Sequence, residues 1–246
     1  MPRNQQQSRQ PPGPAPPPPR IVPSRETLTA RRERTTAITQ RLAEHYPDAQ
    51  CSLRFTNPFE LLIATILSAQ CTDKRVNLVT PALFRRWPTP EKMATASLPE
   101  LEKAVQTTGF FRAKAKNIHG CCRGLVDRFG GIVPATLTEL VSLPGVGRKT
   151  ANVVLGCAFG LAEGVVVDTH VGRISRRLGL TKATDAVQAE RDLIKVVPRE
   201  HWIAISHWLI EHGRGTCLAR RPRCEGCSLA ELCPRVGLAR PRTGSK

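Results

Sequence analysis

The sequence predicts an all-α protein of about ten short helices. Helix start signals recur along the chain, where a capping residue is followed by proline or, three positions later, by glutamate. Strand signals are sparse, because the clearest β-branched run, 165–167, is only three residues long. The 246 residues are enough to bury a sizeable core. Aromatic residues make up 4% of the chain, so we expect that core to be mostly aliphatic.

The chain begins with a segment that we expect to be disordered. Residues 1–23 contain nine of the 21 prolines, and such a composition cannot bury enough apolar surface to form a core. We therefore assign residues 1–24 to a proline-rich tail. Its arginines, Arg3, Arg9 and Arg20, either stay solvated or tether the chain weakly to nucleic-acid phosphates.

The first predicted helix lies within residues 25–45, where Ile38 and Leu42 are spaced four residues apart. The stretch 59–69 is apolar all round, which is typical of a helix buried in the middle of a bundle. Start signals or helical patterns predict further helices at Thr89–Glu91, Ser97–Glu100, 137–141, 151–158 and 186–197.

The charge of the chain indicates a polyanionic partner. Lys and Arg number 37 and Asp and Glu number 20, which gives a net charge of +17 at pH 7. Nucleic acid is the first candidate and an anionic membrane the second. The longest apolar run, 59–67, is interrupted by Glu60 and Thr65 and is far shorter than the roughly 20 residues of a spanning helix. The first 20 residues hold no apolar signal-peptide stretch, so we expect an intracellular protein with reduced thiols.

A glycine-rich turn between two predicted helices is the most informative stretch. Its sequence, LPGVGRKTA over 143–151, places Gly145 and Gly147 so that the chain can reverse tightly and a ligand backbone can come close. The amides that start the next helix favour an anion such as a DNA phosphate. A P-loop is excluded, because it has four residues between its glycines and a glycine directly before its lysine, whereas Arg148 precedes Lys149. The alternative is a plain corner between two helices.

These residues resemble the motifs of a known family. The turn at 143–151 resembles the helix–hairpin–helix of the endonuclease III family of DNA repair glycosylases. The sequence VDTH at 167–170 resembles the catalytic-aspartate segment of that family. The sequences NPFELL at 57–62 and LSAQ at 67–70 are similar to two further family motifs. The resemblance covers the chain from about residue 30 to about residue 235.

The resemblance implies a protein of two helical lobes. One lobe, 51–161, is expected to be a helical barrel that contains the helix–hairpin–helix at about 136–160. The other combines residues 25–50 with 162–240 and is expected to carry an iron–sulfur cluster loop. The lesion site would then lie in the groove between the two lobes.

Lys149 and Asp168 match the catalytic pair of the family. A lysine amine attacks a sugar C1′ only when it is neutral, and both a helix start and the neighbouring Arg148 disfavour a further positive charge. From its position alone, Lys149 is either such a nucleophile or a solvated phosphate-binding lysine. Asp168 fits the N-cap of a helix that starts near His170. As a catalytic group it would stabilise the positive charge of the breaking glycosidic bond and move protons. The resemblance implies the catalytic role for both.

Four cysteines near the C-terminus form a candidate ligand set. In a reducing compartment, four thiols within 17 residues indicate a metal ion or an iron–sulfur cluster. Structural zinc more often shows two C-x2-C pairs, and zinc is the alternative here. The spacing resembles the 4Fe–4S loop of the endonuclease III family, which implies one 4Fe–4S cluster per chain. The ligands would be Cys217, Cys224, Cys227 and Cys233. The other cysteines are expected to be small core residues: Cys51, Cys71, Cys121, Cys122 and Cys157.

Further residues are expected to contact DNA. The loop between the first two cysteine ligands carries three arginines and a proline, which is a good phosphate-binding arrangement. In the family, a glutamine and an apolar residue after a glycine fill the gap that base flipping leaves. Gln70 and Phe110 match these positions, and a place in the core is the alternative for Phe110. His170 matches a position near the family's active site. The full expected DNA-binding set is Gln70, Phe110, Gly145, Gly147, Arg148, His170, Arg220, Arg221 and Arg223.

The resemblance implies a bifunctional enzyme of base excision repair. It would remove oxidised pyrimidines from double-stranded DNA and cut 3′ to the abasic site by β-elimination through a lysine Schiff base. One alternative is a monofunctional enzyme similar to adenine glycosylases, which lack a lysine at the position of Lys149. The other is a DNA-binding helix–hairpin–helix module without chemistry. We expect a monomer in the bacterial cytoplasm, associated with the nucleoid, and no membrane partner.

Overall fold

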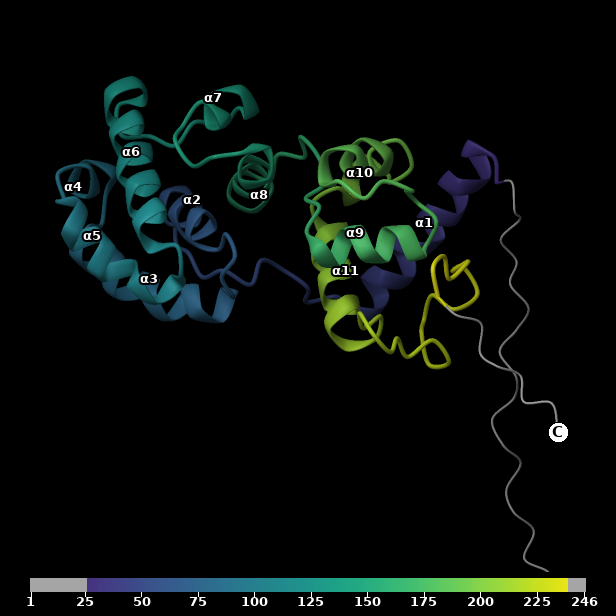
Figure 1. The fold of residues 1–246 in the computed structure, drawn as a ribbon. Coiled ribbons are helices and arrows are strands. Elements are labelled where there is room, and N and C mark those ends of the chain that lie inside the picture. Colours follow the sequence, from purple (N-terminus) through teal and green to yellow (C-terminus); the bar gives the residue numbers. More distant parts are fainter. Residues whose placement is uncertain (1–25, 239–246) are drawn as a thin grey trace, which may run out of the picture.

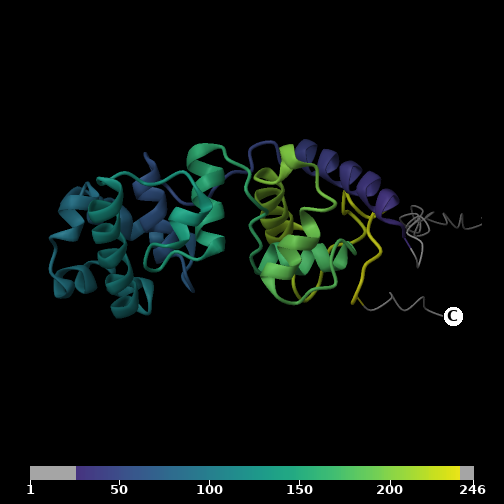
Figure 2. The same ribbon diagram turned by 90° about the horizontal axis from the view of Figure 1, so that it is seen from above.

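The structure, a computed structural model, describes residues 26–238, and these form helices and no strand. The all-α prediction is confirmed. Two groups of helices lie side by side and are connected by two segments, 46–57 and 160–168, which we refer to as the neck (Figures 1 and 2). The proline-rich tail predicted for residues 1–24 lies outside the described residues, as do residues 239–240 of the predicted cluster lobe. The predicted lobe boundaries stay a prediction.

The first lobe is built around α2 (Pro58–Leu67), which packs against α3, α6 and α8. Eight of the ten residues of α2 are buried, in agreement with its apolar composition. One continuous cluster of buried hydrophobic side chains runs from Leu53 to Leu155 and forms the core of this lobe. The other elements of the lobe are α3 (Asp73–Arg86), α4 (Pro90–Ala94), α5 (Leu98–Val105), η1 (Gln106–Thr108), α6 (Phe111–Phe129), α7 (Leu137–Val141) and α8 (Arg148–Phe159).

Side-chain caps begin the helices of the first lobe where the sequence predicts them. The Asn57 side chain accepts a hydrogen bond from the Glu60 amide at 3.0 Å, with Pro58 in the first turn. Ser97 and Glu100 form the predicted capping box of α5. The predicted helix 59–69 stops earlier, at Leu67. The Ala69 amide bonds only three residues back, to the Ile66 carbonyl at 3.4 Å, and Gln70 adopts the left-handed region with φ 52°.

The second lobe combines α1 (Leu28–His45) with the helices that follow the neck. Ile38 and Leu42 of α1 join a separate buried cluster that continues from Val165 to Leu229. The predicted helix 186–197 ends at Leu193, after which the chain turns and buries Val196 and Val197. The later elements are α9 (Thr169–Arg177), α10 (Ala186–Leu193), η2 (Arg199–His201) and α11 (Ala204–Gly215). Residues 216–238 follow without an α-helix.

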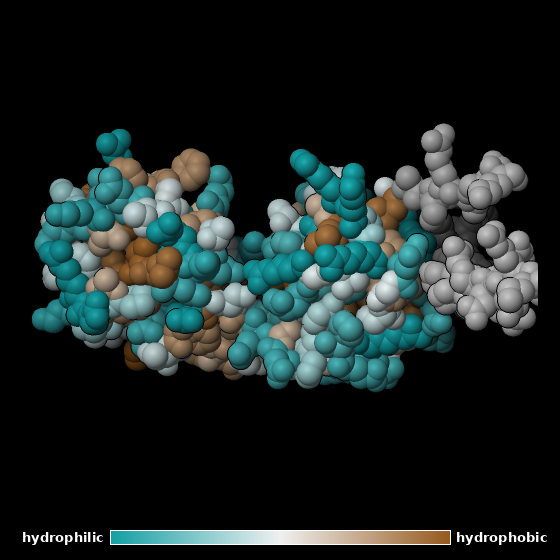
Figure 3. All heavy atoms as spheres, turned by 90° about the horizontal axis from the view of Figure 1, so that it is seen from below, coloured by the Kyte–Doolittle hydropathy of each residue, from teal (hydrophilic) through white to brown (hydrophobic). Residues whose placement is uncertain are grey.

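The surfaces of the two lobes differ. On the face drawn in Figure 3, hydrophobic side chains gather over the first lobe, and hydrophilic ones predominate over the second. Within residues 26–238, no helix is both long enough and apolar enough to span a membrane.

Candidate active site

The glycine-rich turn joins α7 to α8, and its two glycines have different roles. Gly145 has φ +76°, and a Cβ there would lie 2.7 Å from the Cβ of Asn117 on α6. A side chain therefore fits neither the backbone conformation nor the space. Gly147 has φ −90°, and a Cβ there would meet nothing within 4 Å. Gly145 thus seats the turn against α6, whereas Gly147 leaves open space at its tip.

The N-terminus of α8 has no cap of its own. Its N-cap residue, Gly147, has no side chain to accept a hydrogen bond, and the first turn contains no acidic residue. By contrast, Asn57, Thr72 and Asp168 cap α2, α3 and α9 with side-chain oxygens. The first amides of α8 are thus available to an external anion, which the helix dipole also favours.

Lys149 and Asp168 lie together although 19 residues separate them. Lys149 is in the first turn of α8, and Asp168 is the N-cap of α9, where its Oδ1 accepts a hydrogen bond from the Val171 amide at 2.7 Å. Both residues line two neighbouring cavities at the neck. One cavity is also lined by Ser206 and His207 of α11. The N-cap interpretation of Asp168 is thus confirmed, and its place beside Lys149 leaves room for the catalytic one.

Arg148 is held by a carboxylate of the second lobe. Its guanidinium donates to both oxygens of Glu190 on α10, with distances of 2.9 and 3.0 Å. Glu190 is buried and also accepts from the Nδ2 of Asn152, one turn further along α8, at 3.0 Å. The hydrogen bond with Glu190 raises the pKa of Arg148 above its usual value. Arg148 therefore links α8 to α10, and its charge is offset beside Lys149.

A second polar link forms the wall of the cavity. Arg214 of α11 donates to Asp73 Oδ2 at 3.3 Å and to Ser52 Oγ at 3.2 Å, so it connects the second lobe to the start of α3 and to the neck. It also pairs with Glu211 within α11, at 3.1 Å. Asp73, Glu211 and Arg214 all line the cavity that contains Lys149.

The four predicted ligand cysteines line one cavity in the second lobe. All four thiols are free and half-buried. Burial raises the pKa of Cys227 to about 11 and raises the pKa of Cys233 as well, so these thiols are neutral until a metal ion ionises them. His212 lies behind them, with its Nε2 3.6 Å from the Cys227 Sγ. Burial lowers the pKa of His212 to about 4 and keeps the ring neutral.

Arg177 provides a test of what fits this cavity. Its guanidinium is buried and donates to the Sγ of Cys217 at 3.2 Å and to the carbonyls of Leu218 and Ala219 at 2.7 Å each. No carboxylate among residues 26–238 forms an ion pair with it. A buried charge needs a compensating one, and an anionic thiolate-ligated group would supply it.

The four thiols are gathered around one space. Cys217, Cys224, Cys227 and Cys233 all line the same cavity, and four cysteine thiolates are the usual ligand set of a 4Fe–4S cluster. These residues therefore fit such a cluster.

Comparisons with known proteins agree with this geometry. Residues 63–199 match the family model of the HhH-GPD superfamily of base excision DNA repair proteins, and residues 217–233 match the iron-sulfur binding domain of endonuclease III. The chain is 55% identical to endonuclease III of Synechocystis sp. over 207 residues, which are 84% of this chain and 94% of that protein. The chain belongs to the endonuclease III family. Endonuclease III of Bacillus subtilis is 45% identical, over 83% of this chain and 93% of its own length.

Solved structures of endonuclease III share the fold. A non-covalent endonuclease III–DNA complex matches with a TM-score of 0.78 at 44% identity, over 83% of this chain and 95% of that one. A trapped endonuclease III–DNA covalent intermediate matches with the same TM-score and identity, over 83% and 96%. The family resemblance, the two-lobed helical fold and the iron–sulfur cluster site are therefore confirmed, and the zinc alternative is set aside.

The two residues expected to open the duplex are exposed and conformationally unusual. Gln70 and Phe110 have φ values of 52° and 47°, in the left-handed region that non-glycine residues rarely adopt. Phe110 is 66% exposed, so its alternative place in the core is wrong.

The other expected DNA-binding residues lie in different surroundings. Arg220, Arg221 and Arg223 are exposed on the loop between the first two ligand cysteines. His170 is half-buried in the first turn of α9, where a Cβ on Gly213 would lie 2.6 Å from its Nδ1. His170 therefore packs against α11 and lines neither cavity of Lys149.

Sequence analysis missed the polar residues that hold the two lobes at this site. Glu190 and Arg214 are the clearest cases, because each bonds to the other lobe. Glu190 sits within a short amphipathic helix with no motif around it. Glu211 and Arg214 have the spacing of a pair on one helix turn, but nothing in the sequence points to Asp73 as a further partner.

Proposed function

We propose that this chain excises oxidised pyrimidines from DNA and then cleaves the strand 3′ to the abasic site, with Lys149 as nucleophile and Asp168 as its partner. The single observation that carries this assignment is that the two residues share both cavities at the neck. The chain is a member of the endonuclease III family, whose enzymes are DNA glycosylases with AP lyase activity. The trapped covalent intermediate of a relative 44% identical supports a covalent route.

In the first step the Lys149 amine attacks C1′ of the damaged nucleoside. The glycosidic bond breaks as the C–N bond to lysine forms, and the base leaves with the bonding electrons and takes up a proton. Positive charge develops at the sugar, and the Asp168 carboxylate stabilises it from across the cavity. The Asp168 cap bond uses Oδ1 and holds the carboxylate in place for this role.

In the second step the amine and the sugar form an imine as the sugar ring opens. Loss of a proton from C2′ then expels the 3′ phosphate, which is β-elimination, and water releases Lys149 afterwards. Asp168 carries protons to and from the amine in these steps. The pairing of Arg148 with Glu190 fixes the start of α8 and so keeps Lys149 oriented.

The remaining residues bind the duplex. The uncapped amides of α8 receive one phosphate, with Gly147 leaving room for the strand and Gly145 shaping the turn. Arg220, Arg221 and Arg223 bind phosphates of the backbone without reading sequence. Gln70 and Phe110 fill the space of the flipped nucleotide. His170 contacts the lesion strand through the first turn of α9.

The partner is double-stranded DNA that contains damaged pyrimidines or abasic sites. The net charge of +17 supports this assignment. We place the protein as a monomer in the bacterial cytoplasm, at the nucleoid, since relatives in the family are proteins of bacteria such as Bacillus subtilis. The cluster bound by the four cysteines has a structural role, since it holds the loop that presents the three arginines.

Borohydride trapping tests the catalytic assignment. Added during turnover of a duplex with one oxidised pyrimidine, borohydride should reduce the imine and leave a stable protein–DNA adduct. Lys149→Gln should abolish both the adduct and strand cleavage but bind the lesion duplex nearly as well, because it removes one of 37 basic side chains. Asp168→Asn should slow base release and cleavage by about 10²–10⁴-fold.

Lys103→Gln is the matched control, because it removes the same charge from an exposed position on α5 and should trap and cleave like the wild type. Trapping by Lys149→Gln would place the nucleophile elsewhere. A wild-type protein that releases the base without ever forming an adduct would instead be a monofunctional enzyme that uses water.

A further inference from the structure

Two cysteines outside the cluster site lie together at the neck. Cys51 is in the segment between α1 and α2, and Cys157 is near the end of α8. Cys51 and His207 of α11 line the same cavity, and the Sγ of Cys157 is 3.5 Å from the Nε2 of His207. Both thiols therefore lie beside one imidazole ring. Their interaction lowers the pKa of Cys51 and raises that of Cys157. Burial lowers the pKa of His207 and favours the neutral ring, which accepts a hydrogen bond from Cys157 in the tautomer that carries its proton on Nδ1.

The two thiols are both half-buried, but they differ in the cavities that they line. Cys51 lines two cavities at the neck, one of which also contains Lys149. Cys157 lines neither, so a small molecule in these cavities reaches Cys51 first. Cys121 and Cys122 on α6 offer a contrast within the same chain, because both are fully buried and burial raises their pKa strongly.

Cys51 and Cys157 stand at the two ends of the chain segment that forms the core of the first lobe. The buried hydrophobic side chains of the first lobe run from Leu53 to Leu155. Cys51 stands two residues before the first of them, and Cys157 stands two residues after the last. A bond between these sulfurs would close the entire core of the first lobe into one covalent ring at the neck.

We propose that Cys51 and Cys157 form a reversible disulfide when the protein meets a peroxide, and that this bond closes the first lobe at its neck. The Cys51 thiol loses its proton, and the thiolate attacks one peroxide oxygen, so an S–O bond forms, the O–O bond breaks and the hydroxide leaves as water with that proton. Cys157 passes its proton to His207, and its sulfur attacks the Cys51 sulfur. The S–S bond forms, the S–O bond breaks, and the hydroxyl leaves as water with the proton from His207.

The sum of these steps is balanced. Two thiols and one hydrogen peroxide give one disulfide and two waters, and two electrons pass from the sulfurs to the peroxide. Constraint of the unfolded chain by the long ring should stabilise the first lobe. The device would therefore make the lobe that carries Lys149 more resistant to unfolding under the oxidative conditions that damage DNA bases.

Peptide mapping of the cluster-loaded protein tests the proposal. The protein is treated with a small excess of hydrogen peroxide, free thiols are alkylated under denaturing conditions, and the digest is analysed by mass spectrometry. We expect a peptide linked through Cys51 and Cys157 that disappears after dithiothreitol. Cys121 and Cys122 should remain alkylated, and absorbance at about 400 nm should report that the cluster is retained.

Two further measurements sharpen the test. The melting temperature of the oxidised wild type should rise by roughly 5 °C and return after reduction, with no rise in Cys51→Ser or Cys157→Ser. His207→Gln should slow formation of the linked peptide roughly tenfold or more, because it removes the proton acceptor. Absence of the linked peptide, oxidation of Cys51 without a link, or a link without a rise in melting temperature would each overturn the proposal. Should a serine variant fail to fold, the wild-type map and its reversal still decide.

Discussion

Each of the two lobes of this molecule is stabilised by a different kind of interaction. The core of the first lobe contains 28 buried hydrophobic residues, whereas that of the second contains 16. Most residues of the first lobe lie in helices, so most of its backbone groups bond within helices and caps. The second lobe includes residues 216–238, where no α-helix is formed, and the backbone carbonyls there need other partners.

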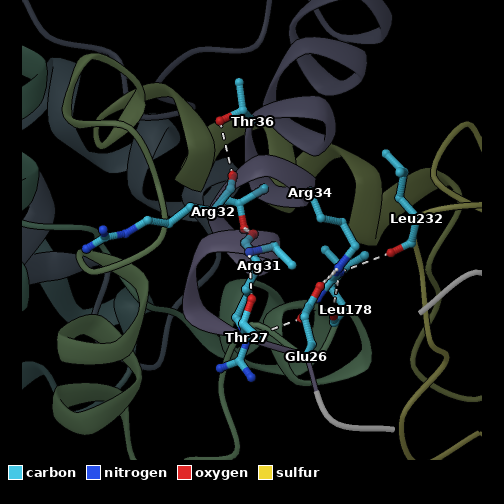
Figure 4. A network of polar contacts seen from close by, with 10 residues as sticks. Glu26, Thr27, Arg31, Arg32, Arg34, Thr36, Leu178 and Leu232 are labelled. Atoms are coloured by element: carbon cyan, nitrogen blue, oxygen red, sulfur yellow. Dashed lines mark hydrogen bonds and ion pairs between the residues drawn. The ribbon is translucent and has the colours of Figure 1, made fainter. Parts of the chain in front are cut away.

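Buried arginines supply many of those partners. The guanidinium of Arg34 on α1 donates to the carbonyls of Leu178 and Leu232 at 2.8 and 3.0 Å, and Glu26 neutralises it (Figure 4). Arg177 bonds in the same way to the carbonyls of Leu218 and Ala219. These side chains attach the cysteine-bearing segment to α1 and α9.

The comparison teaches that two helical lobes of one chain can depend on different kinds of interaction for their stability. Apolar burial is spread over many side chains, so the first lobe loses stability gradually when one is changed. The second lobe concentrates its stability in a few charged contacts and in one ligand set. Removing one of these contacts or ligands should leave unsatisfied polar groups in the irregular segment. The second lobe should then become less stable while the first lobe keeps its stability.

The largest effect is expected from Cys227→Ser. Loss of one ligand should release the cluster, leave the buried Arg177 without a compensating charge and unfold the second lobe, while the first lobe keeps its helices. Iron content and absorbance at about 400 nm should fall nearly to zero. Hydrogen exchange should become fast in α9, α11 and residues 216–238 and remain slow in α2.

Cys71→Ser is the control, since Cys71 is half-buried after α2 and has no place among the ligands. It should keep both the iron and the slow exchange. If Cys227→Ser retained a folded second lobe, the arginine contacts and the smaller core would suffice without the cluster, and the contrast between the lobes would fail.

Local signals explain what the sequence predicted of this fold. The caps at Asn57, Ser97 and Thr136 and the apolar run of α2 each involve residues that are close together in the chain, so the sequence alone reveals them. The sequence does not single out α6 and α11, because their N-cap residues, Phe110 and Ile203, form no side-chain cap. Their positions depend on packing against other elements.

An intermediate effect is expected from Glu190→Gln. The amide cannot neutralise Arg148, and it weakens the two bonds that hold α8 to α10. Because the Arg148 side chain is 45% exposed, solvent offsets part of the loss, and we expect a cost of about 1–2 kcal/mol in the free energy of unfolding. Urea unfolding measures that cost. Cleavage should slow as well, because the start of α8 positions Lys149.

Glu163→Gln provides the matched comparison. Glu163 is exposed and raises the pKa of Arg148 through its charge alone, without the bonds that Glu190 makes. It should leave stability and cleavage nearly unchanged. Equal losses in the two variants would mean that the charge near Arg148 matters and the link between the lobes does not.

The sequence predicted those site residues that lie close together in the chain and missed those that come from distant elements. The glycines, Lys149 and Arg148 lie within one nine-residue motif, and the ligand cysteines lie within 17 residues. Glu190, the partner of Arg148, and Asp73, the partner of Arg214, lie on other elements, and no spacing in the sequence indicates either pairing. The sequence therefore also could not show that Arg148, which we expected to contact DNA, donates its hydrogen bonds to Glu190.

The smallest effects on stability should appear at acid pH, and they should differ between the two lobes. Hydrogen bonds from Arg34 hold the pKa of Glu26 below its usual 4.5, and hydrogen bonds from Ser97 do the same for Glu100 on α5. A carboxyl whose folded-state pKa is lowered stabilises the fold fully above its unfolded-state pKa. That contribution is lost as the pH falls below about 4.5 and through the lowered value.

Glu26→Gln should therefore lower the stability of the second lobe at pH 6 and flatten its decline from pH 6 to pH 4. Glu100→Gln should do the same for the first lobe to a much smaller extent, because the Glu100 side chain is 44% exposed and solvent screens its capping bonds. Urea unfolding at several pH values, followed by hydrogen exchange in α1 and α5, measures each lobe separately.

Added salt should reduce the effect at Glu100 and leave that at Glu26, whose side chain is 7% exposed, largely intact. Equal pH slopes in the two variants would show that the guanidinium contacts of the second lobe contribute no more than a surface cap, and the distinction between the lobes would then rest on the cluster alone.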